Sequence, residues 1–161
     1  MREDPLTGLA NRRALEERIV PAMSVARRWK HPLSIIMTDL DRFKSVNDDH
    51  GHLTSDQVLV SFARMLKISC RIEDLLTRFG GEEFIILLPN TNLEQAVTLA
   101  ERFRENAEAA ILPVPRTVTA SFGVTLFVPE DTRESLVSRA DRAMYIAKTN
   151  GRNRVEVLSP A

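Results

Sequence analysis

The sequence predicts an α+β domain in which a mixed sheet has helices packed against it. Three observations support this prediction. Apolar residues recur at helical spacing in several segments, short apolar runs typical of strands lie between them, and two such runs are separated only by a glycine pair. Strands joined so closely form an antiparallel hairpin, and a hairpin within an alternating helix–strand order implies a mixed sheet. A doubly wound parallel fold is therefore excluded.

The first half of the chain predicts one strand among three helices. Pro21 should kink or divide the first helix, because proline lacks the amide donor and clashes with the preceding turn. Gly51 should end the second helix. The segments are, in order, a helix over 11–30, a buried strand over 33–37, a short helix over 43–48 and an amphipathic helix from Asp56 to about Arg71.

The second half predicts four strands and two helices. Gly80 and Gly81 suit a two-residue hairpin turn, because both central positions of that turn require positive φ. Pro89 should end the hairpin's second strand, and Gly151 should end the last helix. The segments are, in order, strands over 75–79 and 82–88, a helix over 93–107, a β-rich stretch over 116–127, a helix over 136–147 and an edge strand over 154–158.

Composition narrows the classes of protein and partner. The 161 residues suit a single domain, since a chain of this size buries roughly 70% of its unfolded surface. Its 22 Lys and Arg residues balance 22 Asp and Glu residues, so the net charge of zero argues against a nucleic-acid partner. A small phosphorylated ligand stays compatible with this balance.

The sequence also predicts a cytoplasmic domain that makes no membrane contact of its own. Cys70 is the only cysteine, so no internal disulfide forms, as is usual in a reducing compartment. No apolar run reaches the roughly 18 residues of a membrane-spanning helix, and Arg2, Glu3 and Asp4 stand where a signal peptide would become apolar. A longer parent protein could still be tethered to a membrane.

Four carboxylates follow or begin predicted strands. Asp39 follows the first strand, Asp41 lies two residues on, and Glu82 and Glu83 begin the strand after the glycine pair. If the hairpin lies beside the first strand, Asp39 and Glu82 converge at one end of the sheet. Such oxygen ligands suit Mg²⁺, and two ions about 4 Å apart would polarise an attacking hydroxyl and neutralise a leaving phosphate. The alternative is that these acids are solvated strand ends.

The glycine pair adds to this constellation. Glycines let a backbone approach phosphate closely, and their amides form an anion-binding nest. Taken alone, the pair is more often a plain hairpin turn. The chain lacks a glycine-rich loop of the Walker or dinucleotide type, so any nucleotide must be held otherwise.

Several motifs together resemble one family. Residues 80–84 read GGEEF and match the GG[D/E]EF signature of the GGDEF family of diguanylate cyclases. Further blocks agree in order over about 150 residues: 4–12 (DPLTGLANR), 39–44 (DLDRFK), 47–48 (ND), 51–52 (GH), 141–145 (DRAMY), 147–148 (AK) and 151–153 (GRN). The resemblance implies a mixed, mostly antiparallel five-stranded sheet flanked by helices, related to the palm of nucleotidyl cyclases and polymerases.

The resemblance also implies an activity and an organisation. Residues 1–161 would form a single GGDEF domain at the C-terminal end of a longer bacterial signalling protein with an upstream sensory domain. Two such domains would face each other in an antiparallel homodimer and condense two GTP into cyclic di-GMP with release of two pyrophosphates. Each 3′-hydroxyl would attack the α-phosphate held by the partner. Cyclic di-GMP usually governs the switch between motility and biofilm.

By the same resemblance, each active site would hold two Mg²⁺ ions, with Mn²⁺ as an alternative. Their ligands would be the Asp39 carboxylate, the Leu40 backbone carbonyl, and Glu82 and Glu83. Glu82 is also a candidate base for the 3′-hydroxyl, but a base beside two cations has a low pKa, so activation by metal is the alternative. Lys44 would stabilise the transition state of phosphoryl transfer.

The resemblance assigns GTP binding to three groups of residues. Asn47 and Asp56 would read guanine, with His52 in the same pocket. The Asp56 carboxylate accepts from guanine N1–H, whereas adenine offers an acceptor at N1, so GTP would be preferred over ATP. The phosphates would be held by the turn of Gly80 and Gly81 and by the side chains of Lys148 and Arg152. Taken alone, these two cations would be ordinary charges at a helix C-terminus.

Ser55 departs from the family pattern, which has glycine directly before the guanine-reading Asp56. If that glycine requires positive φ, serine there is strained and Asp56 shifts. If the position is a helix N-cap, serine serves as well. We favour the N-cap, because an amphipathic helix begins here.

An inhibitory product site is the last feature that the resemblance implies. Arg71 and Asp74 form an RxxD motif five residues before Gly80, and Arg102 matches a secondary arginine of that site. The arginines would bind phosphate or stack on guanine, and Asp74 would accept from guanine. A salt bridge at a helix end is the alternative. The rival functions for the whole chain are a non-catalytic nucleotide sensor and another palm-type cyclase.

Overall fold

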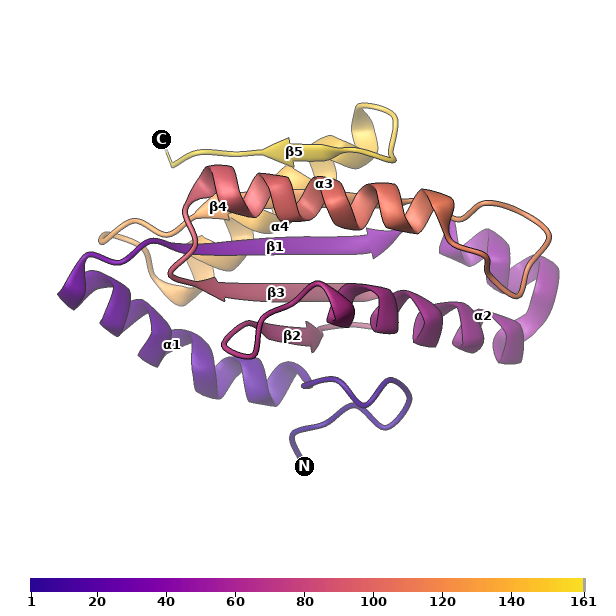
Figure 1. Ribbon diagram of the computed structural model, residues 1–161, viewed down its shortest axis with the longest axis horizontal. Coiled ribbons are helices and arrows are strands. Elements are labelled where there is room, and N and C mark those ends of the chain that lie inside the picture. The colour runs from indigo at the N-terminus through magenta and orange to yellow at the C-terminus, as the bar shows by residue number, and fades with distance from the viewer. Residues whose placement is uncertain (161) are drawn as a thin grey trace.

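The chain folds into one five-stranded sheet with helices on both faces (Figure 1). This computed structural model describes residues 1–160. The strand order is β2-β3-β1-β4-β5, and every neighbouring pair is antiparallel except β4 and β5. The elements are α1 (Arg12–Trp29), β1 (Leu33–Leu40), α2 (Phe43–Ile68), β2 (Leu75–Arg78), β3 (Glu83–Pro89), α3 (Leu93–Ala109), β4 (Ala120–Leu126), α4 (Arg133–Thr149) and β5 (Val155–Val157). The predicted fold class is confirmed.

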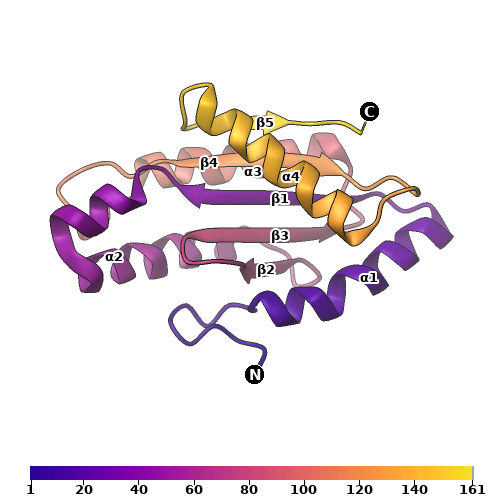
Figure 2. The same cartoon turned by 180° about the vertical axis from the view of Figure 1, so that it is seen from behind.

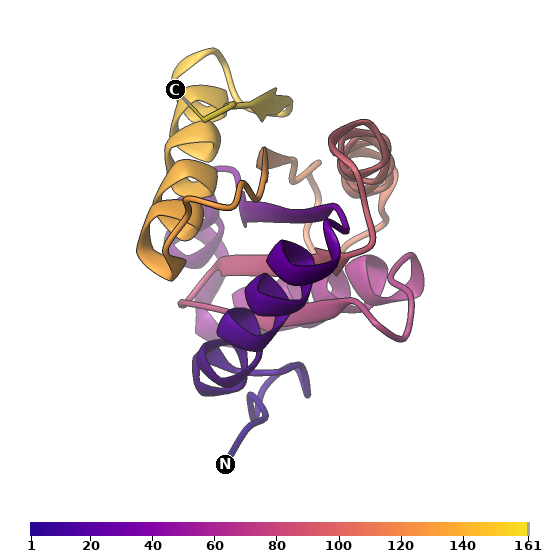
Figure 3. The same cartoon turned by 90° about the vertical axis from the view of Figure 1, so that its left-hand side faces the viewer.

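Two hydrophobic cores lie on the two faces of the sheet. Helices α2 and α3 cover one face, where Phe62 and Phe103 pack on the strands, and α1 and α4 cover the other, where Ile19 and Leu136 do so (Figures 2 and 3). Strand β1 runs through the middle and is buried on both faces, as its continuous apolar run predicts. Within the described residues, no helix combines the length and apolarity needed to cross a membrane.

Helix α1 continues through Pro21, so the expectation that proline would divide it is wrong. Proline removes the amide that would bond to the carbonyl of Glu17. Both residues are exposed, so water can satisfy that carbonyl. The helix retains its buried face through Leu15, Ile19 and Met23.

The glycine pair does not form the predicted two-residue turn. Strand β2 ends at Arg78 and β3 begins at Glu83, so four residues connect them, and neither Gly80 nor Gly81 has a positive φ. The turn is closed by the amide of Phe79, which donates to the carbonyl of Glu83 at 2.8 Å. Glu82 therefore lies in the turn and not in the strand.

Helix α2 joins the two helices that the sequence predicts separately. Gly51 is the break between them, with φ 83° and ψ 169°. Such a φ favours glycine, because other side chains clash there. The second part ends at Ile68, three residues before the predicted end at Arg71.

Close contact between β4 and α4 depends on Gly123. A Cβ atom at this position would lie 2.2 Å from the amide nitrogen of Met144 and 2.4 Å from the carbonyl oxygen of Ala140. Only glycine lets the helix backbone approach the strand this closely. The C-terminal half of α4 is thereby held against the centre of the sheet, which fixes where Lys148 lies.

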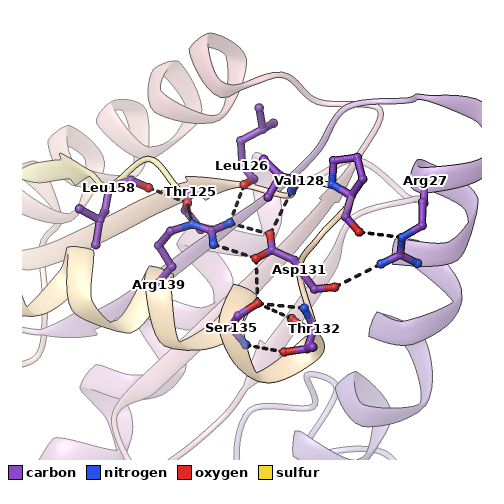
Figure 4. A network of polar contacts seen from close by, with 10 residues as sticks. Arg27, Thr125, Leu126, Val128, Asp131, Thr132, Ser135, Arg139 and Leu158 are labelled. Carbon is purple, nitrogen blue, oxygen red and sulfur yellow. Dashed lines mark hydrogen bonds and ion pairs between the residues drawn. The ribbon is translucent and has the colours of Figure 1, made fainter. Parts of the chain in front are cut away.

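A buried ion pair anchors the start of α4 (Figure 4). The guanidinium of Arg139 makes two parallel hydrogen bonds to the carboxylate of Asp131, at 2.7 and 2.8 Å, and donates to Thr125 and to the carbonyl of Leu126. The carboxylate also accepts from the Ser135 hydroxyl. Both charged side chains are almost fully buried, and their hydrogen-bonding groups are matched by these partners.

Asp131→Ala should destabilise the domain by about 3–5 kcal/mol, because it leaves the Arg139 charge buried without a partner. Urea unfolding followed by circular dichroism would measure the loss. The double variant with Arg139→Leu should recover much of it, since two apolar residues leave no unpaired charge. A loss below about 1 kcal/mol, the range of exposed pairs, would contradict this account.

Candidate active site

The register of the central strands brings the predicted acids to one end of the sheet. Asp39 on β1 lies directly opposite Glu83 on β3, and opposite Ser121 on β4. Glu82 precedes β3 in the turn, and the charge of Asp39 influences both glutamates. Asp39, Glu82 and Glu83, here called the acidic cluster, therefore lie on neighbouring segments. This is the convergence that the sequence predicts for Asp39 and Glu82.

Lys148 is the single side-chain partner of the Asp39 carboxylate within residues 1–160. The Asp39 side chain is 13% exposed, and its buried Oδ1 forms an ion pair with the Lys148 ammonium. Burial, together with the charges of Asp41 and Asp141, raises the pKa of Asp39 despite the opposing effect of Lys148. A carboxylate offers about four acceptor positions, so one that is paired with a single lysine keeps positions open to an ion or ligand.

The ionised forms of Glu82 and Glu83 are also disfavoured by their surroundings. Burial and the charge of Asp39 raise the pKa of Glu82 and of Glu83, and Lys148 only partly opposes this. Ionised carboxylates that repel one another in a half-buried site are stabilised by a bound cation. The electrostatics of the acidic cluster therefore fit a divalent cation.

The acidic cluster is an open site and not a closed cage. Within residues 1–160, no three His, Cys, Asp or Glu side chains are already gathered around one metal position. Mg²⁺ in proteins is usually held by one or two carboxylates, with water and substrate phosphates completing the shell. Asp39 with Glu82 or Glu83 fits that pattern, and the Leu40 carbonyl lies at the same strand end, 3.4 Å from the Lys148 ammonium.

The cations expected to hold phosphates lie at the C-terminal end of α4. Lys148 reaches the acids and donates to Asp41 Oδ1 at 2.7 Å. Arg152 is half-buried in the turn after the helix, and its amide donates to the carbonyl of Ala147. Lys44 is exposed on the first turn of α2. Lys148 is therefore joined directly to the acidic cluster.

The expected guanine-reading residues lie on the two parts of α2. Asn47 and Asp56 are half-buried on either side of the break at Gly51, and His52 is exposed. The hydroxyl of Ser55 lies 3.2 Å from Asn47 Oδ1 and 3.0 Å from the carbonyl oxygen of His52.

Ser55 is buried inside the helix and is not its N-cap, so the favoured interpretation of this residue is wrong. The helix resumes at His52, directly after Gly51, four residues earlier than the N-cap interpretation required. Ser55 also has no positive φ, so the strained alternative is equally wrong.

The arginines of the RxxD region line a separate cavity of about 230 Å³ with Asp74. Arg71 donates to Asp74 at 3.1 Å, to the carbonyl of Pro89 at 2.8 Å and to the hydroxyl of Thr91 at 2.6 Å. Arg102, on α3, lines the same cavity. Since Pro89 and Glu83 end the same strand, about 20 Å separates this cavity from the acidic cluster.

Two features of the site were not anticipated from the sequence. A cavity of about 480 Å³ between α1 and α4 reaches Glu83 and is lined by Arg12 and Asp141 among others. Arg78 pairs with Asp4 at 3.1 Å and donates to the carbonyl of Gly81 at 2.7 Å, which ties the N-terminal turn to the glycine turn. No local pattern indicates the Arg78–Asp4 pair, because the two residues are 74 positions apart in the chain.

The fold and the acidic cluster together define a palm-like domain of the nucleotidyl cyclase class. The family description "Diguanylate cyclase, GGDEF domain" matches residues 1–154. The diguanylate cyclase DgcP of Pseudomonas aeruginosa is 44% identical over 159 residues, which cover 96% of this chain and 23% of DgcP. The chain belongs to the GGDEF domain family of diguanylate cyclases.

Solved structures agree with this assignment. The GGDEF domain of DgcB from Caulobacter crescentus in complex with c-di-GMP is 31% identical, with a TM-score of 0.93 over 97% of this chain and 92% of that one. The active GGEEF domain of a Vibrio cholerae diguanylate cyclase is 35% identical, with a TM-score of 0.89 over 95% and 99%. The chain spans less than half the length of the curated relatives cited here, such as DgcP and VdcA of Vibrio cholerae, at 23% and 46%.

Glu82→Gln should raise the melting temperature of the cation-free protein. The folded protein raises the pKa of Glu82, so its ionised form is unfavourable and the fold loses stability as pH rises from the ordinary glutamate pKa through the raised one. Scanning fluorimetry at about pH 5 and pH 7 would show a larger gain at the higher pH. Glu130→Gln, at an exposed turn residue, is the matched control. A lower melting temperature for Glu82→Gln at pH 7 would contradict the electrostatic account.

Proposed function

We propose that this domain condenses two GTP molecules into cyclic di-GMP and releases two pyrophosphates. The observation that carries the proposal is the juxtaposition of Asp39, Glu83 and Lys148 at one end of the central strands. This combines cation-binding oxygens with a cation for phosphate. The names of the relatives and the cyclic di-GMP bound to DgcB support the same substrate and product.

The residues divide into those that hold cations and those that hold GTP. Asp39, the Leu40 carbonyl, Glu82 and Glu83 would bind Mg²⁺, which supplies activation of the 3′-hydroxyl and neutralises charge on the phosphates. Lys148, Arg152 and Lys44 bind the triphosphate, and Lys44 stabilises charge that develops on the α-phosphate. The Gly80–Gly81 turn has open space above Gly81, where a Cβ atom would meet nothing within 4 Å, so phosphates can approach its backbone.

Guanine is read at α2. Asp56 accepts from N1–H and the 2-amino group, and Asn47 adds a second polar contact with His52 beside it. Adenine would leave the Asp56 carboxylate facing an acceptor, so the site favours GTP. The helical break at Gly51 supports this assignment, because it separates the Asn47 turn from the Asp56 turn and leaves both half-buried.

One domain supplies only half of the reacting groups. Each protomer holds one GTP, and an antiparallel homodimer places each 3′-hydroxyl near the partner's α-phosphate. A longer parent protein with an upstream sensory domain would control this encounter, and the small share of the relatives that the chain covers supports that organisation.

The cavity of Arg71, Asp74 and Arg102 binds the product and inhibits the enzyme. Two guanidinium groups and a carboxylate in one hollow match the phosphates and guanine edges of cyclic di-GMP. Because the cavity is about 20 Å from the acidic cluster, inhibition acts by restraining the encounter of two domains and not by blocking GTP.

Incubation with GTP and Mg²⁺ should yield cyclic di-GMP, and Asp39→Ala should lower turnover at least about 100-fold, because loss of a metal ligand exceeds the loss typical of an outer partner. Chromatography identifies the product, and incubation with GTP plus ATP distinguishes other palm-type cyclases. Turnover by Asp39→Ala equal to that of the wild type would refute the metal assignment.

The rate of cyclic di-GMP formation should rise more steeply than in proportion to the protein concentration, because two domains must meet. A rate strictly proportional to protein concentration would refute the half-site mechanism.

Cyclic di-GMP should bind with micromolar-range affinity, on the order of −8 kcal/mol, and Arg71→Ala should abolish binding without loss of fold. Titration calorimetry measures the affinity, and inhibition of turnover should follow it. Arg64→Ala, at an exposed residue of α2 outside this cavity, is the control. Undiminished binding by Arg71→Ala would remove the product site from this cavity.

A further inference from the structure

Asp41, two residues after Asp39, has every acceptor position occupied by the protein itself. Its Oδ1 accepts from the Ser121 hydroxyl at 2.6 Å and from the Lys148 ammonium at 2.7 Å. Its Oδ2 accepts from the Thr119 hydroxyl at 2.6 Å and from the Asn153 amide at 3.0 Å. A carboxylate offers about four acceptor sites, so none is left for a cation.

The neighbouring carboxylate contrasts with it. Asp39 is paired with Lys148 alone and its side chain is 13% exposed, whereas Asp41 is more deeply buried, at 3%, and is fully bonded. Asp39 therefore has acceptor positions open to a ligand, and Asp41 has none. The two acids of the Asp-x-Asp segment therefore have different tasks.

Asp41 bonds to both parts of the chain that carry the phosphate-binding cations. One is the side chain of Lys148, through its ammonium. The other is the turn that carries Arg152, in which Gly151, Arg152 and Asn153 have φ values of 122°, 66° and 46°. Two successive non-glycine residues at positive φ are costly, so the turn requires bonds from outside itself. The Asn153 amide bonded to Asp41 is one such bond.

We propose that Asp41 is a positioning residue for the triphosphate, which holds Lys148 and the Arg152 turn in place and does not bind metal. The inference rests on the proposed function, since it takes these two cations as the triphosphate contacts. When Asp39 engages a cation, Lys148 gives up Asp39 but keeps its bond to Asp41. Its remaining donors then face the phosphates.

Asp41→Asn tests this, because the amide replaces an acceptor by a donor beside the Asn153 amide and removes the charge facing Lys148. The ligand is a GTP analogue with a methylene bridge between the α- and β-phosphates, compared with GMP, which lacks the outer phosphates. By calorimetry, the analogue should bind about 10–100-fold more weakly to Asp41→Asn, the range for loss of a charged hydrogen-bond partner. Affinity for GMP should change less than about threefold.

Cation binding provides the second measurement. Mn²⁺ titrated without nucleotide and followed by electron paramagnetic resonance should bind wild type and Asp41→Asn equally, and Asp39→Asn much more weakly. Loss of Mn²⁺ affinity in Asp41→Asn would make Asp41 a metal ligand and overturn the inference. If Asp41→Asn lost affinity equally for the analogue and for GMP, the role of Asp41 would be merely structural, and the inference would be overturned. Unchanged affinity for the analogue would also overturn it.

Ser121→Ala replaces Asp41→Asn if that variant does not fold. This change removes one donor from Asp41 Oδ1. It should weaken binding of the analogue by a smaller factor than Asp41→Asn does, and it should leave binding of GMP unchanged. Ser34→Ala, at a buried serine whose hydroxyl donates to the Thr91 carbonyl at the opposite end of the sheet, is the matched control and should change neither. If wild type itself does not bind the analogue, the proposed function fails; if wild type binds and both variants match it, only this inference fails.

Discussion

The pairing register of β1 with β3 is the constraint on which the rest of the site depends. In this register Asp39 faces Glu83, and Met37 and Ile35 face residues of the same buried core. A slip by one residue would turn Asp39 toward the core of α2 and α3 and turn those apolar side chains away from their own core. The burial of β1 on both faces therefore fixes the acidic cluster. The position of Asp39 at the end of β1 and the burial of the apolar residues in the middle of β1 depend on the same pairing with β3.

The position of α4 is the second requirement, because Lys148 must reach the end of β1 from a different layer. Gly123 lets the helix approach β4, and the Asp131–Arg139 pair anchors its first turns. Asp41 then holds the helix's last turn through Lys148 and Asn153. Contacts at both ends and in the middle thus define the helix's axial position, which a hydrophobic face alone would leave free to slide.

The sequence predicts what local patterns determine. Helical spacing and apolar runs predict the order of the helices and strands, with α2 predicted as two helices, because periodicity reflects burial directly. The same patterns fail where a particular side-chain bond or a break in the backbone overrides the local preference, and where partners are distant in the chain. The glycine pair predicts a tight turn, but Arg78 bonded to Gly81 favours a wider one, and Ser55 is placed inside α2 because Gly51 already breaks the helix. The Asp41 network is invisible to any local pattern, since its donors lie about 80 and 110 residues away.

The difference between Asp39 and Asp41 explains how a charged site is compatible with a stable fold. Two buried carboxylates so close together would repel each other, and two unsatisfied ones would cost several kcal/mol. Full bonding of Asp41 offsets the desolvation of that carboxylate, whereas Asp39 is paired with Lys148 alone and is the more exposed of the two. Lys148 offsets part of the charge before any ligand arrives. Of the two carboxylates, Asp39 therefore keeps acceptor positions open, and under the proposed function a cation and a polyphosphate would gain free energy by completing its surroundings.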